Sequence, residues 1–299
     1  MQHTKKHRNI KWALVLSGGG AKGLAHVGVL KALSDRGFPE PSLVVGTSMG
    51  AIVGGLYACG ISPADITRYV LEEFDITAYL DSFVFKLNGP VGKVFQTGQI
   101  LGNFATRRGV DSGQGLLKLF EELTQGKTFT ETKIPFRCNA VDLISGKELV
   151  FSSGSVARAI RASMSFPAFF EPLVEEKEGS ASQCLVDGGL ADNMPVYIAR
   201  NAGFRRVLAV DVYHFKTVPV SDLKTGPHIV YRAIEVAINM MERKRGSPAD
   251  LTLYTADHAS PFNFFRKKEF IELGEQTVKE REPQIRAFFS TRRHRISGT

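Results

Sequence analysis

The chain of 299 residues is 43% hydrophobic and 10% aromatic, which is typical of a globular protein with one sizeable core. Its formal net charge of +8 comes from the two ends, because residues 1–11 and 286–299 each carry four basic and no acidic residues. The neutral body argues against a broad basic face for nucleic acid, and no apolar run is long enough to span a bilayer.

The cysteines and the N-terminal region point to the compartment. Cys59, Cys138 and Cys184 are widely spaced and odd in number, which supports neither a disulfide framework nor a zinc site. The apolar run at 12–16 is too short for a signal sequence, so we expect a cytoplasmic protein. The basic ends are interpreted as solvated tails, with attraction to an anionic membrane surface as the alternative.

The first third of the chain predicts alternating strands and helices. Residues 12–16 form a continuous apolar run, typical of a strand buried on both faces, and a glycine-rich loop at 18–23 follows. Apolar residues then recur at helical spacing as far as Gly37. A second buried strand at 43–45 leads into another helix, and the resulting β-α-β unit should be right-handed.

The remainder of the chain is more mixed. Residues 74–112 set phenylalanines among glycines and lysines, which indicates a long, partly irregular insertion of the kind that forms a lid or binding surface. An amphipathic helix is expected around 229–240 and a charged helix over 268–290, interrupted at Pro283. Further strands are expected at 136–141, 148–151, 184–186, 206–212 and 251–254. One α/β domain follows from this order.

The most informative motif is G-T-S-M-G at residues 46–50, with Ser48 at its centre. G-x-S-x-G between a strand and a helix is the nucleophile elbow, which lifts a serine hydroxyl out of the sheet on a strained turn. Glycines are expected on both sides because side chains there would clash in a tight backbone fold. Two rows of small residues in the next helix predict close packing against its neighbours. The competing interpretation is a glycine-rich turn with a surface serine.

Gly18, Gly19 and Gly20 follow the strand that should neighbour the elbow strand, so both loops should open at one carboxyl edge of the sheet. Successive glycine amides can point at one oxygen, which makes them candidates for an oxyanion hole. The loop also fits the dinucleotide pattern G-x-G-x-x-G. That pattern needs an acidic residue at the end of the second strand, and a P-loop needs Lys-Ser/Thr where this chain has Leu24-Ala25. Nucleotide binding is therefore disfavoured.

A serine nucleophile also needs a base, which is most often a histidine. None of the seven histidines lies in a setting that marks it as catalytic, although a distant partner stays open, and His26 is interpreted as a helix residue or a donor behind the site. Asp187 follows a buried strand and precedes two glycines, which permits a close approach to Ser48. Asp211 is the rival acid, interpreted as a paired polar group near a strand end.

At this point the chain resembles the patatin-like phospholipases. Four motifs agree in order over about residues 12–213: the loop G-G-G-A-K-G, the elbow G-T-S-M-G, D-G-G followed by Asn193-x-Pro195, and R-A-S-M-S-F-P-A-F-F-E-P at 161–172. The resemblance is closest to small bacterial members related to neuropathy-target-esterase catalytic domains. It implies a three-layer α/β/α fold with a mostly parallel central sheet.

The resemblance also implies a mechanism. Ser48 would attack an ester carbonyl and form an acyl-enzyme, Asp187 would act as its base without any histidine, and the amides of Gly18, Gly19 and Gly20 would form the oxyanion hole. No metal or cofactor is implied, and the substrates would be acyl esters of phospholipids or lysophospholipids. Thr47 and Met49 stand where small residues are common in the family, which affects the acyl pocket. A non-catalytic lipid- or partner-binding module of the same fold and an acyltransferase are the alternatives.

The family motifs leave the ends of the chain unassigned. Residues 214–290 match no motif and are expected to form a helix and strand extension packed on the same domain, while 1–11 and 291–299 are basic tails. Phe262, Phe264 and Phe265 precede Arg266-Lys267-Lys268, which suggests peripheral contact with a lipid interface. Core packing of these phenylalanines is the alternative. The sequence predicts no oligomeric state.

Overall fold

The computed structural model describes residues 10–80, 108–176, 181–213, 215–244, 248–255 and 263–290. Several sequence expectations lie outside these residues: positions 81–107 of the 74–112 insertion, Phe262, residues 1–9 of the N-terminal tail and the whole C-terminal tail at 291–299. The same is true of the side chains of every histidine except His26.

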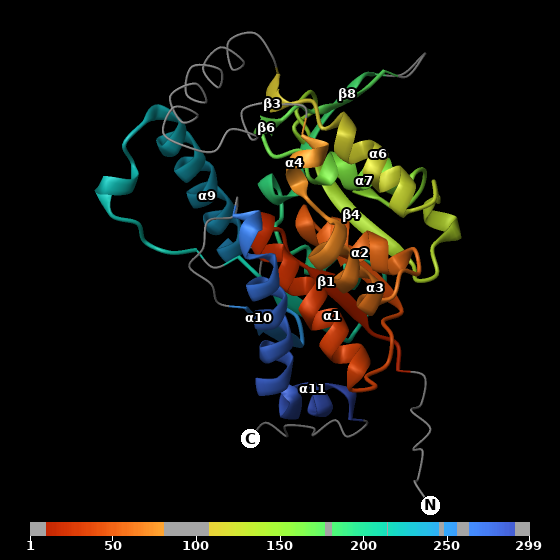
Figure 1. Cartoon of the computed structure of the whole chain (residues 1–299). Helices are drawn as coiled ribbons and strands as arrows, with labels where there is room; N and C mark the ends of the chain where they lie inside the picture. The colour runs from red at the N-terminus through yellow and green to blue at the C-terminus, as the bar shows by residue number, and fades with distance from the viewer. Residues whose placement is uncertain are drawn as a thin grey trace, which may run out of the picture.

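An eight-stranded mixed sheet forms the centre of the described molecule (Figure 1). Its order is β10-β9-β1-β2-β4-β8-β7, and β5 pairs with β4. The mutually parallel strands are β1 (Ala13–Leu16), β2 (Leu43–Gly46), β4 (Phe136–Asp142), β9 (Val207–Asp211) and β10 (Leu251–Tyr254). The antiparallel pairings involve β5 (Lys147–Phe151), β7 (Leu173–Glu175) and β8 (Gln183–Asp187). The predicted α/β fold with a mostly parallel sheet is confirmed.

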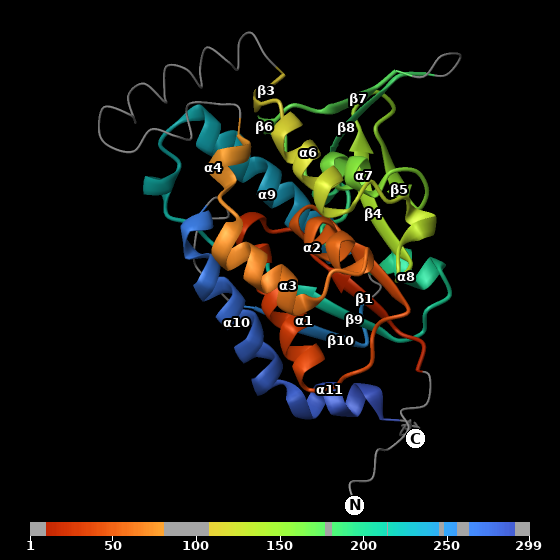
Figure 2. The same cartoon turned by 45° about the vertical axis from the view of Figure 1, so that its right-hand side comes forward.

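Helices cover both faces of this sheet (Figure 2). Neighbouring strand residues point to opposite faces, so Leu14 and Leu16 pack against one helical layer while Ala13 and Val15 pack against the other. The first layer contains α1 (Ala25–Asp35), α2 (Met49–Ala58), α10 (Lys267–Glu280) and α11 (Glu282–Phe289). The second contains α8 (Val196–Asn201). This is the expected three-layer arrangement.

The C-terminal region lies directly against the first helix of the chain. A Cβ placed on Gly28 of α1 would lie 1.9 Å from the Ile271 carbonyl oxygen, and one on Gly274 would lie 2.1 Å from that of Ala25. The backbones of α1 and α10 therefore meet without intervening side chains. The break between α10 and α11 falls next to Pro283, as expected. A domain division at residue 213 stays a prediction.

The remaining helices surround the carboxyl edge of β2. Ser62 caps the first of them by accepting a hydrogen bond from the Asp65 amide. They are α3 (Pro63–Arg68), the π-helical turn η2 (Tyr69–Glu73), α4 (Ile76–Tyr79), α6 (Gln114–Leu123), α7 (Val156–Ser163) and α9 (Gly226–Lys244). None of the helices in the described ranges has the length and apolar character needed to cross a membrane.

The sequence predictions included neither the helices α6 and α7 nor the shortest elements. A two-stranded parallel sheet joins β3 (Gly109–Asp111) to β6 (Ala168–Phe170). Single 3-10 turns are η1 (Gly20–Leu24), η4 (Phe129–Glu131), η5 (Gly188–Leu190), η6 (Val220–Asp222) and η7 (Phe264–Arg266). Two of these turns, η1 and η5, follow strands that end at the candidate site.

Candidate active site

Ser48 lies at a sharp turn between β2 and α2. Its backbone angles are φ 53° and ψ −121°, a sparsely populated conformation for a residue with a side chain that costs about 1–3 kcal/mol. A Cβ on Gly46 would lie 2.3 Å from the Gly50 carbonyl oxygen, and one on Gly50 would lie 2.2 Å from that of Leu16. The expectation that both flanking glycines are needed is confirmed, and the turn has the strain of a nucleophile elbow.

The helix that follows Ser48 packs as closely as its small residues predict. A Cβ on Gly54 would lie 2.9 Å from Val44 Cγ1, and one on Gly55 would lie 2.6 Å from Ile160 Cδ1. Helix α2 is therefore pressed between its own strand and α7. This packing fixes the direction in which the elbow leaves the sheet.

Strand β4 brings the elbow and Asp187 together. Gly46, the last residue of β2, pairs with Cys138, whereas Asp187, the last residue of β8, pairs with Ala140. Because β5 occupies the opposite edge of β4 at both levels, β2 and β8 share one edge and run toward each other. Their final residues are two β4 positions apart, roughly 7 Å at the usual rise of a strand. Asp187 thus reaches the elbow at the end of an antiparallel strand.

The Asp187 carboxyl group is buried beside the serine. Its residue is 3% exposed, its Oδ1 accepts a hydrogen bond of 2.8 Å from the Gly189 amide, and the Ser48 hydroxyl lies close enough to lower the pKa of its carboxyl group. Burial raises the pKa of Asp187 to about 6, while the Ser48 hydroxyl and the Gly189 amide act in the opposite direction. A carboxylate with a pKa near the working pH is suited to accept and return a proton.

The glycine loop packs directly against the elbow. A Cβ on Gly18 would lie 3.1 Å from Ser48 Cβ, so the two loops meet at one edge of the sheet as expected. The Gly18 amide, however, already donates to the Asn193 carbonyl oxygen at 3.1 Å. In this arrangement Gly18 contributes close packing rather than a free amide. Gly19 and Gly20 line the cavity next to Ser48 and are the candidates that remain for an oxyanion hole.

Asn139 is a buried residue of the site that sequence reasoning missed. Its Oδ1 accepts a hydrogen bond of 2.7 Å from the Thr47 hydroxyl, beside the nucleophile. Its Nδ2 donates to the Gly188 carbonyl oxygen at 3.2 Å, beside the acid, and to that of Asp192 at 2.9 Å. Asn139 therefore links the two loops through one side chain. A lone amide inside the apolar strand at 136–141 was the available signal.

His26 and the rival acid Asp211 both lie outside the cavity. His26 is fully buried and donates from Nε2 to the Ser17 carbonyl oxygen at 2.8 Å. Burial lowers its pKa to about 4, against the opposing effect of that bond, so the ring is neutral near pH 7. Asp211 accepts a bond of 2.9 Å from the Tyr213 amide at the end of β9. Neither His26 nor Asp211 is among the residues that line the described cavity.

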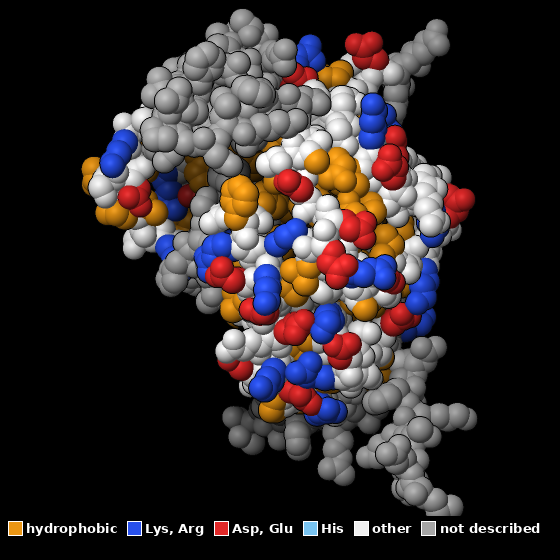
Figure 3. All heavy atoms as spheres, in the orientation of Figure 1, with side chains coloured by type: hydrophobic (Ala, Val, Ile, Leu, Met, Phe, Trp, Pro, Cys, Tyr) orange, Lys and Arg blue, Asp and Glu red, His pale blue; other side chains and the backbone are white. Residues whose placement is uncertain are grey.

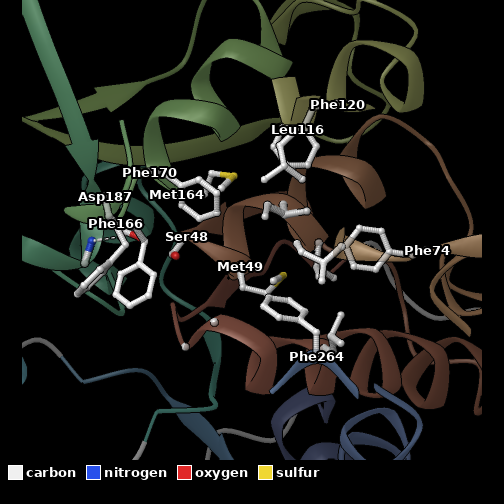
Figure 4. Close-up of a pocket in the computed structure, with 18 of the residues that line it drawn as sticks. Ser48, Met49, Phe74, Leu116, Phe120, Met164, Phe166, Phe170, Asp187 and Phe264 are labelled. Carbon is white, nitrogen blue, oxygen red and sulfur yellow. Dashed lines mark hydrogen bonds between the residues drawn. The ribbon is translucent and has the colours of Figure 1, made fainter. Parts of the chain in front are cut away.

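Ser48 and Asp187 open into an apolar cavity of about 270 Å³. Figure 4 shows them at one end of it, with Phe74, Leu116 and Phe120 toward the other. Met49, one of the two unusual elbow residues, lines the cavity, whereas Thr47 is turned toward Asn139. An apolar space that ends at a strained serine and a buried carboxylate can hold a hydrocarbon chain with its polar end at the reacting groups.

Comparison with known proteins gives a consistent result. Residues 14–200 match the family model described as patatin-like phospholipase. The chain is 35% identical over 202 residues to human patatin-like phospholipase domain-containing protein 6 and 36% identical over 199 residues to lysophospholipase NTE1 of Mycosarcoma maydis. These matches confirm the resemblance inferred from the four motifs.

The alignments cover a much larger share of this chain than of either relative. Each alignment covers 67% of this chain but only 13% and 9% of the respective relative, so the chain corresponds to a small part of those proteins. Among solved structures, human GIVD cytosolic phospholipase A2 is similar with a TM-score of 0.50 at 10% identity, over 93% of this chain and 60% of that one. That likeness concerns the fold.

Proposed function

Since the chain belongs to the patatin-like phospholipase family, we propose that it is a serine acyl hydrolase that cleaves fatty acyl esters of phospholipids or lysophospholipids. The observation that carries the proposal is the strained Ser48 beside a buried Asp187 at the end of an apolar cavity. The names of the two relatives, a patatin-like phospholipase and a lysophospholipase, agree with this substrate class.

The chemistry requires only these two side chains and backbone amides. Ser48 Oγ attacks the ester carbonyl carbon while Asp187 takes the hydroxyl proton. The tetrahedral intermediate then expels the alcohol, which receives that proton, and leaves an acyl group on Ser48. A water molecule attacks the acyl-enzyme with Asp187 again accepting a proton, and the fatty acid departs as the serine is reprotonated. A carboxyl pKa of about 6 suits both directions of transfer near neutral pH.

The developing oxyanion needs donors on the side of the cavity opposite the base. The amides of Gly19 and Gly20 fill this role in the proposal, because both residues line the cavity beside Ser48. A preorganised donor of this kind contributes on the order of 10²–10³ in rate. Gly18 holds their loop in place through its bond to Asn193.

The apolar cavity predicts a preference for long acyl chains. Its walls come from α2 and α6, with Ile52, Leu56, Leu116 and Phe120 among them. Each methylene group removed from water there contributes about 0.8 kcal/mol. Esters of long fatty acids should therefore have a lower KM than short esters with the same leaving group.

Labelling with a fluorophosphonate tests the nucleophile. The wild-type protein should be labelled and should hydrolyse a lysophospholipid, whereas Ser48→Ala should do neither. Ser62→Ala, which removes the exposed cap of α3, is the matched control and should be labelled like the wild type. Folded wild-type protein that is neither labelled nor active contradicts the proposal. Lipid binding without turnover, unaffected by Ser48→Ala, would identify a binding module, and capture of the acyl group by an added alcohol in preference to water would identify an acyltransferase.

We also propose that the rim of the cavity contacts a lipid interface. Phe264 and Phe265 of η7 both line the cavity, and Phe265 is 84% exposed. Figure 3 shows hydrophobic side chains gathered around α4 and α6 on this face, while charged side chains of both signs dominate over α1 and α10. Exposed apolar side chains around such an opening suit docking on a lipid surface, from which a chain could enter directly.

Vesicle flotation tests this contact. Phe265→Ser should lower the fraction of protein that floats with anionic phospholipid vesicles. Leu143→Ser is the matched control, because Leu143 is 54% exposed but lies between β4 and β5 and does not line the cavity. Equal flotation of the wild type and Phe265→Ser would contradict the proposed contact while leaving the hydrolase proposal in place.

A further inference from the structure

The turn at the C-terminal end of α7 contacts both proposed catalytic residues. The backbone amide of Ser48 donates to Ser163 Oγ at 3.0 Å. The backbone amide of Asp187 donates to the carbonyl oxygen of Ser165, also at 3.0 Å. Ser163 and Ser165 are both fully buried. One short segment therefore holds the backbone of the nucleophile and that of the base.

The bond to Ser163 supplies the hydrogen-bond acceptor that the backbone amide of the strained elbow needs. Ser48 is the residue before the first turn of α2, a position where the backbone amide has no carbonyl partner within the helix. The amide cannot join the hydrogen-bond ladder of α2 and needs an acceptor from elsewhere. Ser163 supplies that acceptor from a neighbouring helix. Without this acceptor, the partly buried Ser48 amide would lack a hydrogen bond. Relaxation of the turn would then lower the free energy of the protein.

The α7 turn is itself fixed by a buried guanidinium group. Arg161 is 1% exposed and donates to three carbonyl oxygens, those of Gly113 at 3.0 Å, Ser112 at 2.7 Å and Glu171 at 2.9 Å. It also donates to Ser165 Oγ, which donates in turn to the Arg161 carbonyl oxygen at 2.7 Å. These bonds tie the turn to surrounding backbone, so Ser163 is held by a rigid support.

From this geometry we propose that Ser163 is a positioning residue: it accepts the Ser48 amide and so keeps the strained elbow in the conformation that directs Ser48 Oγ at Asp187. The inference rests on the proposed role of Ser48 as nucleophile. Ser163 is not among the residues that line the described cavity, so it acts through Ser48 and not on the substrate.

Substitution of Ser163 separates positioning from binding. In Ser163→Ala, the maximal rate of fluorophosphonate labelling and the kcat for a lysophospholipid should fall by roughly 10–100-fold, as expected when a reacting group is misplaced by a fraction of an ångström to 1 Å. The KM and the half-saturating probe concentration should change by less than about twofold, because the cavity wall is unaltered. Ser163→Thr retains the hydroxyl acceptor and should restore most of the labelling rate.

The matched control is at the other end of the same helix. Ser155 Oγ accepts a hydrogen bond of 3.3 Å from the Arg158 amide, so Ser155→Ala also removes an amide-to-serine bond. It should lower the melting temperature, as the loss of a cap does, and leave the labelling rate unchanged. A fall in the rate for Ser155→Ala equal to that for Ser163→Ala would overturn the proposal, because it would show a general effect of loosening α7.

The outcomes for inference and premise are distinguishable. Ser163→Ala that is folded and labelled at the wild-type rate overturns the positioning role and leaves the hydrolase proposal standing. Wild-type protein that is not labelled removes the premise and the inference together. If Ser163→Ala does not fold, Ser163→Cys keeps a weak acceptor in a similar volume. A folded Ser163→Cys should be labelled more slowly than the wild type, and an unchanged rate overturns the inference.

Discussion

The nucleophile half and the acid half of the candidate site are held in place by different interactions. Around Ser48, the backbone is confined mainly by steric contacts, since Gly46 and Gly50 leave no space for a Cβ, and Ser163 adds a hydrogen bond to the Ser48 amide. Around Asp187, the backbone is held by hydrogen bonds from residues distant in sequence, with Asn139 bonded to Gly188 and Ser165 bonded to Asp187. The backbone of the nucleophile half is therefore constrained mainly by steric exclusion, and that of the acid half mainly by hydrogen bonds.

This difference predicts how each half responds to substitution. A steric constraint by backbone atoms is broken by adding a single carbon and has no graded intermediate. A hydrogen-bonded constraint can be weakened one bond at a time, and its cost depends on which groups are left unpaired. Changes in the elbow should therefore affect catalysis sharply, and changes around the acid should act on stability as well as on rate.

The largest expected effect comes from removing the charge of the acid while keeping its shape. Asp187→Asn should remain folded and lose activity by about 10⁴-fold, as when a buried catalytic aspartate is replaced by its amide. Asp211→Asn is the matched control, because Asp211 also ends a strand but does not line the cavity. Ester hydrolysis by the two purified variants measures the difference. Substantial activity of Asp187→Asn would assign the base to Asp211 or to a histidine.

The steric half is tested by a single added carbon. Gly46→Ala would bring a Cβ to 2.3 Å from the Gly50 carbonyl oxygen and 2.6 Å from the Ala51 nitrogen, both backbone atoms. We expect the free energy of unfolding to fall by about 1–3 kcal/mol and the labelling rate of Ser48 to fall on the order of 10²-fold.

A second glycine provides the control for this change. Gly226 at the start of α9 has no atom within 4 Å of an added Cβ, so Gly226→Ala should leave both stability and labelling near their wild-type values. Thermal melts and labelling time courses of the two variants give the comparison. If Gly46→Ala were labelled at the wild-type rate, the elbow would be more adaptable than its contacts indicate.

The contrast between the halves also explains what the sequence could predict. The elbow and the glycine loop need residues without a Cβ at successive positions, so G-T-S-M-G and G-G-G-A-K-G carry their signal within a few positions, although some atoms that exclude the Cβ, such as those of Leu16 at Gly50 and Val212 at Gly19, are distant in sequence. Asp187 was found because two glycines follow it. The end-to-end placement of β8 and β2 along β4 leaves no local pattern, because it depends on the register with which each strand pairs with β4.

Long-range side-chain bonds are hidden for the same reason. Asn139 and Ser163 bond to residues 49 and 115 positions away, and the residues next to them in the sequence do not indicate those partners. The use of the Gly18 amide by Asn193, 175 residues later, could not be deduced from the glycine pattern either. Architecture and candidate residues were therefore accessible from sequence, whereas the interactions that fix their geometry were not.

The hydrogen-bonded half is weakened by a change at Asn139. Asn139→Ala would leave the Thr47 hydroxyl and the Gly188 and Asp192 carbonyl oxygens without this partner, at a cost of about 3 kcal/mol in the free energy of unfolding. We expect the rate to fall by roughly tenfold, because Ser48 and Asp187 keep their own steric and backbone supports. Asn201→Ala, on the exposed end of α8, is the control. An unfolding free energy equal to that of the wild type would show that water replaces the lost bonds.

The last expected effect is a pH dependence of stability that opposes the pH dependence of the rate. Burial raises the pKa of Asp187 from 3.8 to about 6, so the folded protein binds this proton more tightly than the unfolded chain. Stability from this group is therefore full below pH 4 and is lost as the pH rises to about 6, by an amount on the order of 3 kcal/mol. Activity should rise over the same interval, because the base must be ionised.

Asp187→Asn isolates this contribution, because the other titrating groups, including His26, are present in both proteins. The variant keeps an oxygen that can accept the Gly189 amide but has no charge to bury. Its melting temperature relative to the wild type should therefore increase between pH 4 and pH 7, and the inactive protein should be the more stable one at neutral pH. A difference that does not change with pH would mean that the carboxylate is already stabilised in the folded protein. The acid half would then hold its ionised carboxylate without an energetic penalty.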